Sequence, residues 1–140
     1  MEHLLVPSKC SISYNIFNKF KNITVAVDAD RQNGLKCLKE HNPLLEVLLL
    51  DDAFQHRKVK AGFYMLLTAY DDLFSEDFLL PTGNLRESRR GAQRADVIVV
   101  TKCPTTLTKE EQSSLKYSLN AYSNATIFFS VIAYDTSVHS

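Results

Sequence analysis

Residues 46–57 run Glu46-Val47-Leu48-Leu49-Leu50-Asp51-Asp52-Ala53-Phe54-Gln55-His56-Arg57, so that a run of aliphatic side chains leads directly into two acids. An apolar run bounded by Pro43 and by an abrupt change to charge is typical of a strand buried on both faces of a parallel sheet. In such sheets, ligands bind beyond the carboxyl ends of the strands. We therefore expect Asp51 and Asp52 at the ligand-binding edge, where adjacent carboxylates favour a hard cation such as Mg²⁺.

The residues alone leave two interpretations of this acid pair. In the first, Asp51 and Asp52 hold a metal ion, as the acidic strand of P-loop nucleotide enzymes does. In the second, they cap the turn that follows the strand. Gln55 and His56 project from the start of the same turn, where a histidine can orient a carboxylate, contact a phosphate or serve as a structural residue only.

The composition is that of an ordinary globular domain. The 140 residues are enough for one core, and sixteen basic residues balance sixteen acidic ones, so nothing predicts a nucleic-acid partner. Cys10, Cys37 and Cys103 have neither disulfide nor zinc spacing, which favours a reducing cytoplasm and buried, inert thiols. No apolar run reaches the roughly 18 residues of a spanning helix, so we expect at most one-sided contact with a membrane.

Apolar runs recur along the chain and predict five strands. Each ends near polar or charged residues, and helix-compatible or loop segments separate them. This pattern favours an α/β fold with a mainly parallel five-stranded sheet and helices on both faces. The expected strands are Ile23–Val27, Val47–Leu50, Phe63–Thr68, Val97–Val100 and Thr126–Ala133.

Two helices are predicted between these strands. The segment Arg31–His41 has apolar residues on one face and is stopped by Pro43. The segment Thr108–Tyr122 begins with a capping box of Thr108 and Glu111, and its apolar stripe is typical of a core-facing helix.

A long segment without a clear period lies at residues 69–93. Structureless stretches of this length tend to be functional. Within it, Arg86 and Glu87 follow a turn at Pro81–Asn84. The arginine fork suits phosphate recognition and the glutamate can aim it, although a solvated surface pair is the alternative. Three further basic residues follow along the chain, Arg89, Arg90 and Arg94. We expect them to lie in a solvated loop, and the alternative is contact with an anionic lipid phosphate.

The most specific motifs lie in three segments, Leu50–Arg57, Phe78–Glu87 and Arg94–Pro104. Together they resemble the tetraacyldisaccharide 4′-kinase family, the lipid A pathway kinases of Gram-negative bacteria, whose motifs look like DDGFQHR, LLPAGPLREP and RADxVVVTK. Their order and spacing agree with the family. The segment Val25–Arg31 resembles the preceding strand and turn of the Bacteroidetes-like branch, and the resemblance covers about residues 20–133.

This resemblance implies a P-loop-NTPase-like fold and an activity. The activity is ATP-dependent phosphorylation of the 4′-hydroxyl of a lipid A disaccharide 1-phosphate, with Mg²⁺ bound by Asp51 and Asp52. The protein is then cytoplasmic and peripheral to the inner membrane face, with the lipid A disaccharide precursor as its partner. The carried-over catalytic residues are Arg86, Glu87 and His56, and the nucleotide-binding residues are Gln55, Thr101 and Lys102. A plain strand exit is the alternative for Thr101 and Lys102.

Several family motifs do not occur in these 140 residues. There is no GxxxxGK[ST] phosphate loop, and the GDEP-type motif would fall near residues 10–13, where no acid stands. The family's C-terminal domain would begin around or after Ser140. We therefore expect a truncated and inactive kinase fragment, with a poorly defined segment at residues 1–19 and a partial kinase α/β domain at residues 20–140.

The alternative function is a non-catalytic domain that binds Mg²⁺ in signalling. Receiver-type domains also combine an acid pair, a threonine and a lysine at the ligand-binding edge of a doubly wound sheet. In receivers, however, these groups come from separate strands, whereas Thr101 and Lys102 follow the same expected strand here.

Overall fold

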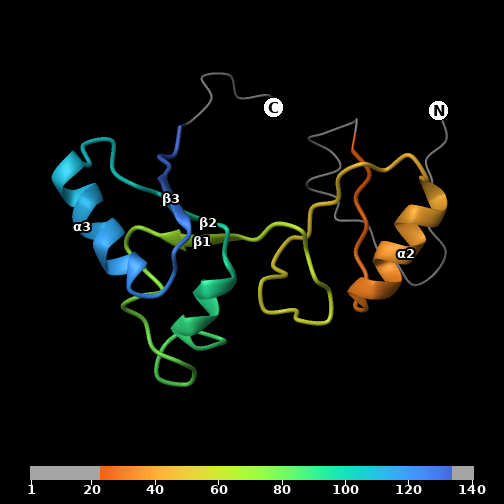
Figure 1. The fold of residues 1–140 in the computed structure, drawn as a ribbon, viewed down its shortest axis with the longest axis horizontal. Helices are drawn as coiled ribbons and strands as arrows, with labels where there is room; N and C mark the ends of the chain where they lie inside the picture. Colours follow the sequence, from red (N-terminus) through yellow and green to blue (C-terminus); the bar gives the residue numbers. More distant parts are fainter. Residues whose placement is uncertain (1–22, 134–140) are drawn as a thin grey trace, which may run out of the picture. The chain divides into compact units, whose positions relative to one another are not determined.

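The computed structural model describes residues 23–133 (Figure 1). The chain divides into two compact units, one of Met1–Asp51 with Arg57–Val59 and the other of Asp52–His56 with Lys60–Ser140. The segment at residues 1–19 that we expected to be poorly defined lies outside the described residues. In chain order the elements are α2 (Arg31–His41), β1 (Met65–Ala69), the 3-10 helix η1 (Arg89–Arg94), β2 (Val97–Thr101), α3 (Lys109–Asn120) and β3 (Thr126–Phe129).

Helix α2 of the first unit spans the residues that the sequence predicted. Asp30 caps its first turn by accepting hydrogen bonds from the backbone N–H groups of Gln32 (3.0 Å) and Asn33 (3.5 Å). At the other end, the N–H of Asn42 donates to the Leu38 carbonyl (2.9 Å), and Pro43 then prevents a further turn.

The second unit contains a parallel three-stranded sheet in the order β1-β2-β3 (Figure 1). Leu66 of β1 is in register with Ile98 of β2, and Ile98 with Ile127 of β3. Parallel neighbours need crossover connections, and η1 and α3 lie in them. Helix α3 begins with the predicted capping box, because Thr108 Oγ1 accepts from the Glu111 N–H (3.2 Å) and the Glu111 carboxylate accepts from the Thr108 N–H (2.8 Å).

The prediction of five strands was wrong, because the described residues form three. The two missing strands are Ile23–Val27 and Val47–Leu50, which fall in the first unit. An extended segment becomes a strand only when a neighbouring backbone completes its hydrogen bonds, and Val47 and Leu49 remain 72% and 90% exposed. The segment Val47–Leu50 is therefore coil, because no backbone among residues 23–133 pairs with it.

The three strands are buried mainly on one face, which differs from the expectation of helices on both. Ile98 and Val100 of β2 and Leu119 of α3 are fully buried. Burial of each such side chain stabilises the folded state by about 1.5–3 kcal/mol. On the opposite face, Met65, Leu67 and Phe128 are 54%, 61% and 54% exposed. The strands consequently alternate between buried and exposed positions.

Among residues 23–133, no helix is both long and apolar enough to span a membrane.

Candidate functional site

The acid pair lies in a turn that follows a coil segment, whereas we expected it at the end of a strand. Asp51 and Asp52 are both exposed, and the first compact unit ends at Asp51 before the second begins at Asp52. The next turn is closed by the His56 N–H, which donates to the Ala53 carbonyl (2.9 Å). Gln55 and His56 are also exposed.

Two predicted site residues have a left-handed backbone. Asp52 has φ 45° and Lys102 has φ 57°, and they are the non-glycine residues with positive φ in the described part of the chain. This conformation is uncommon for a residue with a Cβ, although aspartate tolerates it better than most. Such residues cluster at functional sites, where the surrounding structure fixes them.

An ion pair brings two of the quoted motifs together. The Arg86 Nη1 donates to Asp52 Oδ2 at 3.2 Å, across 34 residues of sequence. The two side chains are 66% and 69% exposed, so the pair contributes at most about 1 kcal/mol. The pair matters for the position of its two members, because it places Arg86, the predicted phosphate-binding residue, beside Asp52, a predicted metal ligand.

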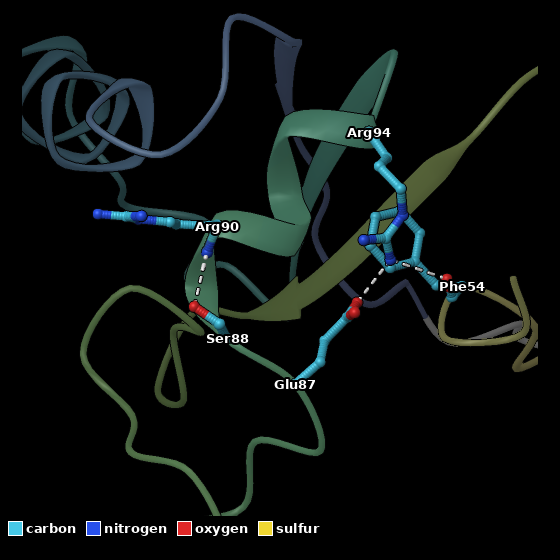
Figure 2. A network of polar contacts seen from close by, with 5 residues as sticks. All are labelled: Phe54, Glu87, Ser88, Arg90 and Arg94. Carbon is cyan, nitrogen blue, oxygen red and sulfur yellow. Dashed lines mark hydrogen bonds and ion pairs between the residues drawn. The ribbon is translucent and has the colours of Figure 1, made fainter.

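A second ion pair is better shielded and extends this cluster (Figure 2). Arg94 Nη2 donates to Glu87 Oε1 at 2.6 Å and to the Phe54 carbonyl at 3.0 Å, while the guanidinium carbon lies 4.7 Å from the centre of the Phe54 ring. The Arg94 and Glu87 side chains are only 29% and 21% exposed. The preference for a solvated Arg94 was therefore wrong.

Arg89 was also expected to be solvated, and it is partly buried in a separate set of contacts. Its Nε and Nη2 donate to the Asp77 carbonyl (2.9 and 2.6 Å), and its guanidinium lies over the rings of Phe78 and Tyr122. Arg90 is exposed, and its N–H donates to the hydroxyl of Ser88, which caps η1 (3.4 Å; Figure 2).

Thr101 and Lys102 lie at the carboxyl end of β2, as predicted. Thr101 Oγ1 donates to the Thr68 carbonyl (3.3 Å), which ties it to β1, and Lys102 is exposed. The adjacent Cys103 is buried, and burial raises the pKa of its thiol. The thiol also donates to the Val100 carbonyl (3.3 Å), so Cys103 is the inert packing residue that the sequence indicated.

Oxygen donors for a metal ion are present but few. Within residues 23–133, no group of three or more His, Cys, Asp or Glu side chains is arranged to hold an ion. Two adjacent carboxylates nevertheless fit Mg²⁺ chemically, because Mg²⁺ is commonly bound through one or two carboxylates and completes its shell with water and substrate phosphates.

Two surface hollows of the second unit lie away from the predicted residues. The first, of about 530 Å³, lies between the segment before β2 and the connection from α3 to β3; the second, of about 550 Å³, is lined by the loop after β1, the start of η1 and Tyr122. None of the predicted catalytic, nucleotide-binding or metal-binding residues lines either hollow, although Arg89 and Arg90 line the second. The candidate site is therefore an open cluster of Asp52, Phe54, Arg86, Glu87 and Arg94.

Sequence reasoning missed Arg94 and Phe54 as parts of this cluster. Both lie inside the quoted motifs, so their positions were available, but their pairing was not. The signal for Arg94 was the acid seven residues earlier, Glu87. The Phe54 contact spans 40 residues, and no local pattern indicates it.

Comparison with known proteins gives consistent matches. Residues 14–134 match the family described as tetraacyldisaccharide-1-P 4′-kinase. The chain is 53% identical over 126 residues to a tetraacyldisaccharide 4′-kinase of Flavobacterium johnsoniae, covering 90% of this chain and 37% of that protein. It is 55% identical over 129 residues to that of Flavobacterium psychrophilum (91% and 38%) and 46% identical over 122 residues to that of Bacteroides fragilis (86% and 32%). The chain thus spans well under half the length of these relatives.

No solved structure matches the chain. The family match covers all three motif segments and favours the kinase over a receiver-type domain. The chain belongs to the tetraacyldisaccharide-1-P 4′-kinase family.

Proposed function

We propose that this chain provides the metal-binding turn and the phosphate-facing loop of a kinase that transfers the γ-phosphoryl group of ATP to the 4′-hydroxyl of a lipid A disaccharide 1-phosphate. The observation that carries the proposal is the ion pair between Asp52 and Arg86. It joins two motifs of the family that are far apart in sequence, and phosphoryl transfer depends on such placement of opposite charges.

Asp51 and Asp52 are the residues that would hold Mg²⁺. When bound, Mg²⁺ neutralises charge on phosphate oxygens. Arg86 faces Asp52 through an exposed and therefore weak pair, so its guanidinium can exchange the carboxylate for a phosphate oxygen at little cost. The same arginine thus balances the acid pair before substrate binds and binds phosphate afterwards.

The remaining roles follow the family motifs. Glu87 and His56 orient the reacting groups around the Asp52 turn, and Gln55, Thr101 and Lys102 contact the nucleotide. Support for Thr101 and Lys102 is their place at the carboxyl end of a central parallel strand, where ligands of open α/β sheets bind. The acylated disaccharide lies in a membrane and ATP in the cytoplasm, so the reaction belongs at the cytoplasmic face of the inner membrane, with peripheral contact.

We further propose that the 140-residue polypeptide alone does not turn over. It contains no GxxxxGK[ST] sequence to bind the nucleotide phosphates and no GDEP-type acid to accept the hydroxyl proton. Loss of a general base alone typically lowers rates by about 10²–10⁴-fold.

A chimera tests both the proposed kinase function and the proposed inactivity of the 140-residue chain alone. The matching segment of the F. johnsoniae relative is replaced by this chain, and phosphoryl transfer from γ-labelled ATP to the tetraacyldisaccharide 1-phosphate is measured. We expect the chimera to label the disaccharide at a rate comparable with the unaltered relative, and the 140-residue chain to give only background. A folded chimera without transfer would refute the proposed function, and labelling by the chain alone would refute its inactivity.

A further inference from the structure

We propose that Arg94 is a positioning residue that holds the Asp52–His56 turn against the Glu87 carboxylate. This inference concerns the proposed kinase site and rests on it for its functional consequence. All the groups involved belong to the second compact unit.

The geometry of Arg94 is that of a bridge between two segments. Its Nη2 carries two N–H groups, and that nitrogen has two acceptors, Glu87 Oε1 at 2.6 Å and the Phe54 carbonyl at 3.0 Å (Figure 2). One nitrogen therefore links the loop that bears Arg86 and Glu87 to the turn that bears Asp52. The low exposure of Arg94 and Glu87 shields these charge-assisted bonds from water.

The Phe54 ring fixes the plane of the guanidinium. Arg94 stacks over this ring at 4.7 Å, and the ring packs edge-on against Tyr64 with centres 6.1 Å apart. The Tyr64 N–H in turn donates to the Asp96 carboxylate (2.7 Å), just before β2. Arg94 thus contacts both the carbonyl and the ring of Phe54. The planar guanidinium can stack on the ring while it donates hydrogen bonds, whereas a lysine ammonium has no plane to stack.

Gly91 leaves the space that Glu87 occupies. A Cβ at Gly91 would lie 2.7 Å from Cδ and Oε1 of Glu87, too close for any real contact. Gly91 has an ordinary backbone conformation, so an alanine there would displace the carboxylate without straining the chain. The Glu87 carboxylate therefore occupies the space beside Gly91 and pairs with Arg94 at the same time.

The chain offers a matched control in Arg89. This arginine is also partly buried, donates to a backbone carbonyl and stacks on aromatic rings, but it holds Asp77 and not the Asp52 turn. Each arginine has a nearby reporter amide. The His56 N–H closes the turn that contains Phe54, and the Asp77 N–H donates to the Leu73 carbonyl (3.2 Å).

Hydrogen exchange of these two amides in the 140-residue chain tests the proposal. Arg94→Lys should accelerate exchange at His56 by about tenfold or more, as expected for loss of one hydrogen bond to a charged group, and leave Asp77 unchanged. Arg89→Lys should accelerate exchange at Asp77 and leave exchange at His56 unchanged. Gly91→Ala, which displaces Glu87 while retaining Arg94, should accelerate His56 exchange as well. Unchanged exchange at His56 in Arg94→Lys, or equal acceleration at both amides, would overturn the positioning role.

Mn²⁺ affinity of the same variants separates this role from the metal site itself. In the wild type we expect binding, with affinity lower by on the order of 10-fold in Arg94→Lys and unchanged in Arg89→Lys. If the wild type binds no Mn²⁺, the proposed metal site is wrong, and the exchange result alone decides the role of Arg94. If Mn²⁺ binds equally well to wild type and Arg94→Lys, Arg94 does not position the metal-binding turn.

Discussion

The Asp52 carboxylate accepts a hydrogen bond from Arg86, so the metal ion that we propose for this carboxylate would compete with an arginine. This competition is weak because both side chains are exposed. Asp52, Arg86 and Glu87 of this cluster were selected from the sequence, whereas Phe54 and Arg94 were not, although both lie within the same motif segments. Which side chain contacts which could not, because the contacts of Asp52 and Phe54 span 34 and 40 residues.

The acid pair itself provides the first prediction. We expect millimolar Mg²⁺ to raise the thermal unfolding temperature of the wild type, and we expect Asp51→Asn together with Asp52→Asn to abolish that rise, because the oxygen donors lose their charge. Without metal, the unfolding free energy should change by less than about 1 kcal/mol, since relief of the repulsion between adjacent carboxylates offsets loss of the weak Asp52–Arg86 pair. Thermal unfolding with and without Mg²⁺ measures both effects. Equal Mg²⁺-induced shifts in the two proteins would show that the ion binds elsewhere.

Removing the competing cation provides the second prediction. Arg86→Gln in the 140-residue chain should strengthen Mg²⁺ binding about two- to fivefold, the factor that corresponds to an exposed ion pair. Isothermal titration measures the affinity. The control is Arg90→Gln, which removes an exposed arginine of the same region and should have a smaller effect. Weaker Mg²⁺ binding in Arg86→Gln than in Arg90→Gln would contradict competition at Asp52.

Helices were more predictable than strands in this chain. Helix α2 spans the expected residues, and α3 begins with the expected capping box, because caps and stop signals are local. Strand formation depends on a neighbouring backbone. The runs that became β1, β2 and β3 have such neighbours, whereas Val47–Leu50 has none within residues 23–133.

The capping box of α3 provides the third prediction, which concerns pH. The N–H of Thr108, and then its hydroxyl, hold the pKa of Glu111 below its usual range. A carboxylate with a depressed pKa stabilises the folded state above its unfolded pKa, and this contribution is lost as pH falls through the folded pKa. The difference in unfolding temperature between wild type and Glu111→Gln should thus be present at neutral pH and shrink as the pH falls below the ordinary range of a glutamate, through the depressed pKa of Glu111.

Thr108→Ala is the companion variant and should lower the unfolding free energy by about 1 kcal/mol at neutral pH. It also removes one of the two groups that depress the pKa of Glu111. A pH-independent difference between wild type and Glu111→Gln would mean that the carboxylate does not bond to the Thr108 N–H in solution.

On the scale of the whole molecule, the sheet of the second unit has one buried face and one largely exposed face. The apolar side chains on the second face of the sheet are more than half exposed at Met65, Leu67 and Phe128. The sequence predicted the α/β class and parallel pairing correctly, and it predicted apolar strands of the kind that are covered on both sides. Coverage is a property of what packs on the sheet, so strand composition alone did not determine it.

The most direct test of the account is the rate of phosphoryl transfer by the chimera described above when it carries Asp51→Asn and Asp52→Asn. In the proposed site, these carboxylates hold the metal ion that neutralises the phosphates, and such an ion contributes several kcal/mol to transition-state stabilisation. We therefore predict that the substitutions lower the rate of disaccharide labelling by on the order of 10²-fold or more relative to the unsubstituted chimera, with the fold retained. A rate within about twofold of the unsubstituted chimera, a difference of less than 0.5 kcal/mol, would contradict the assignment.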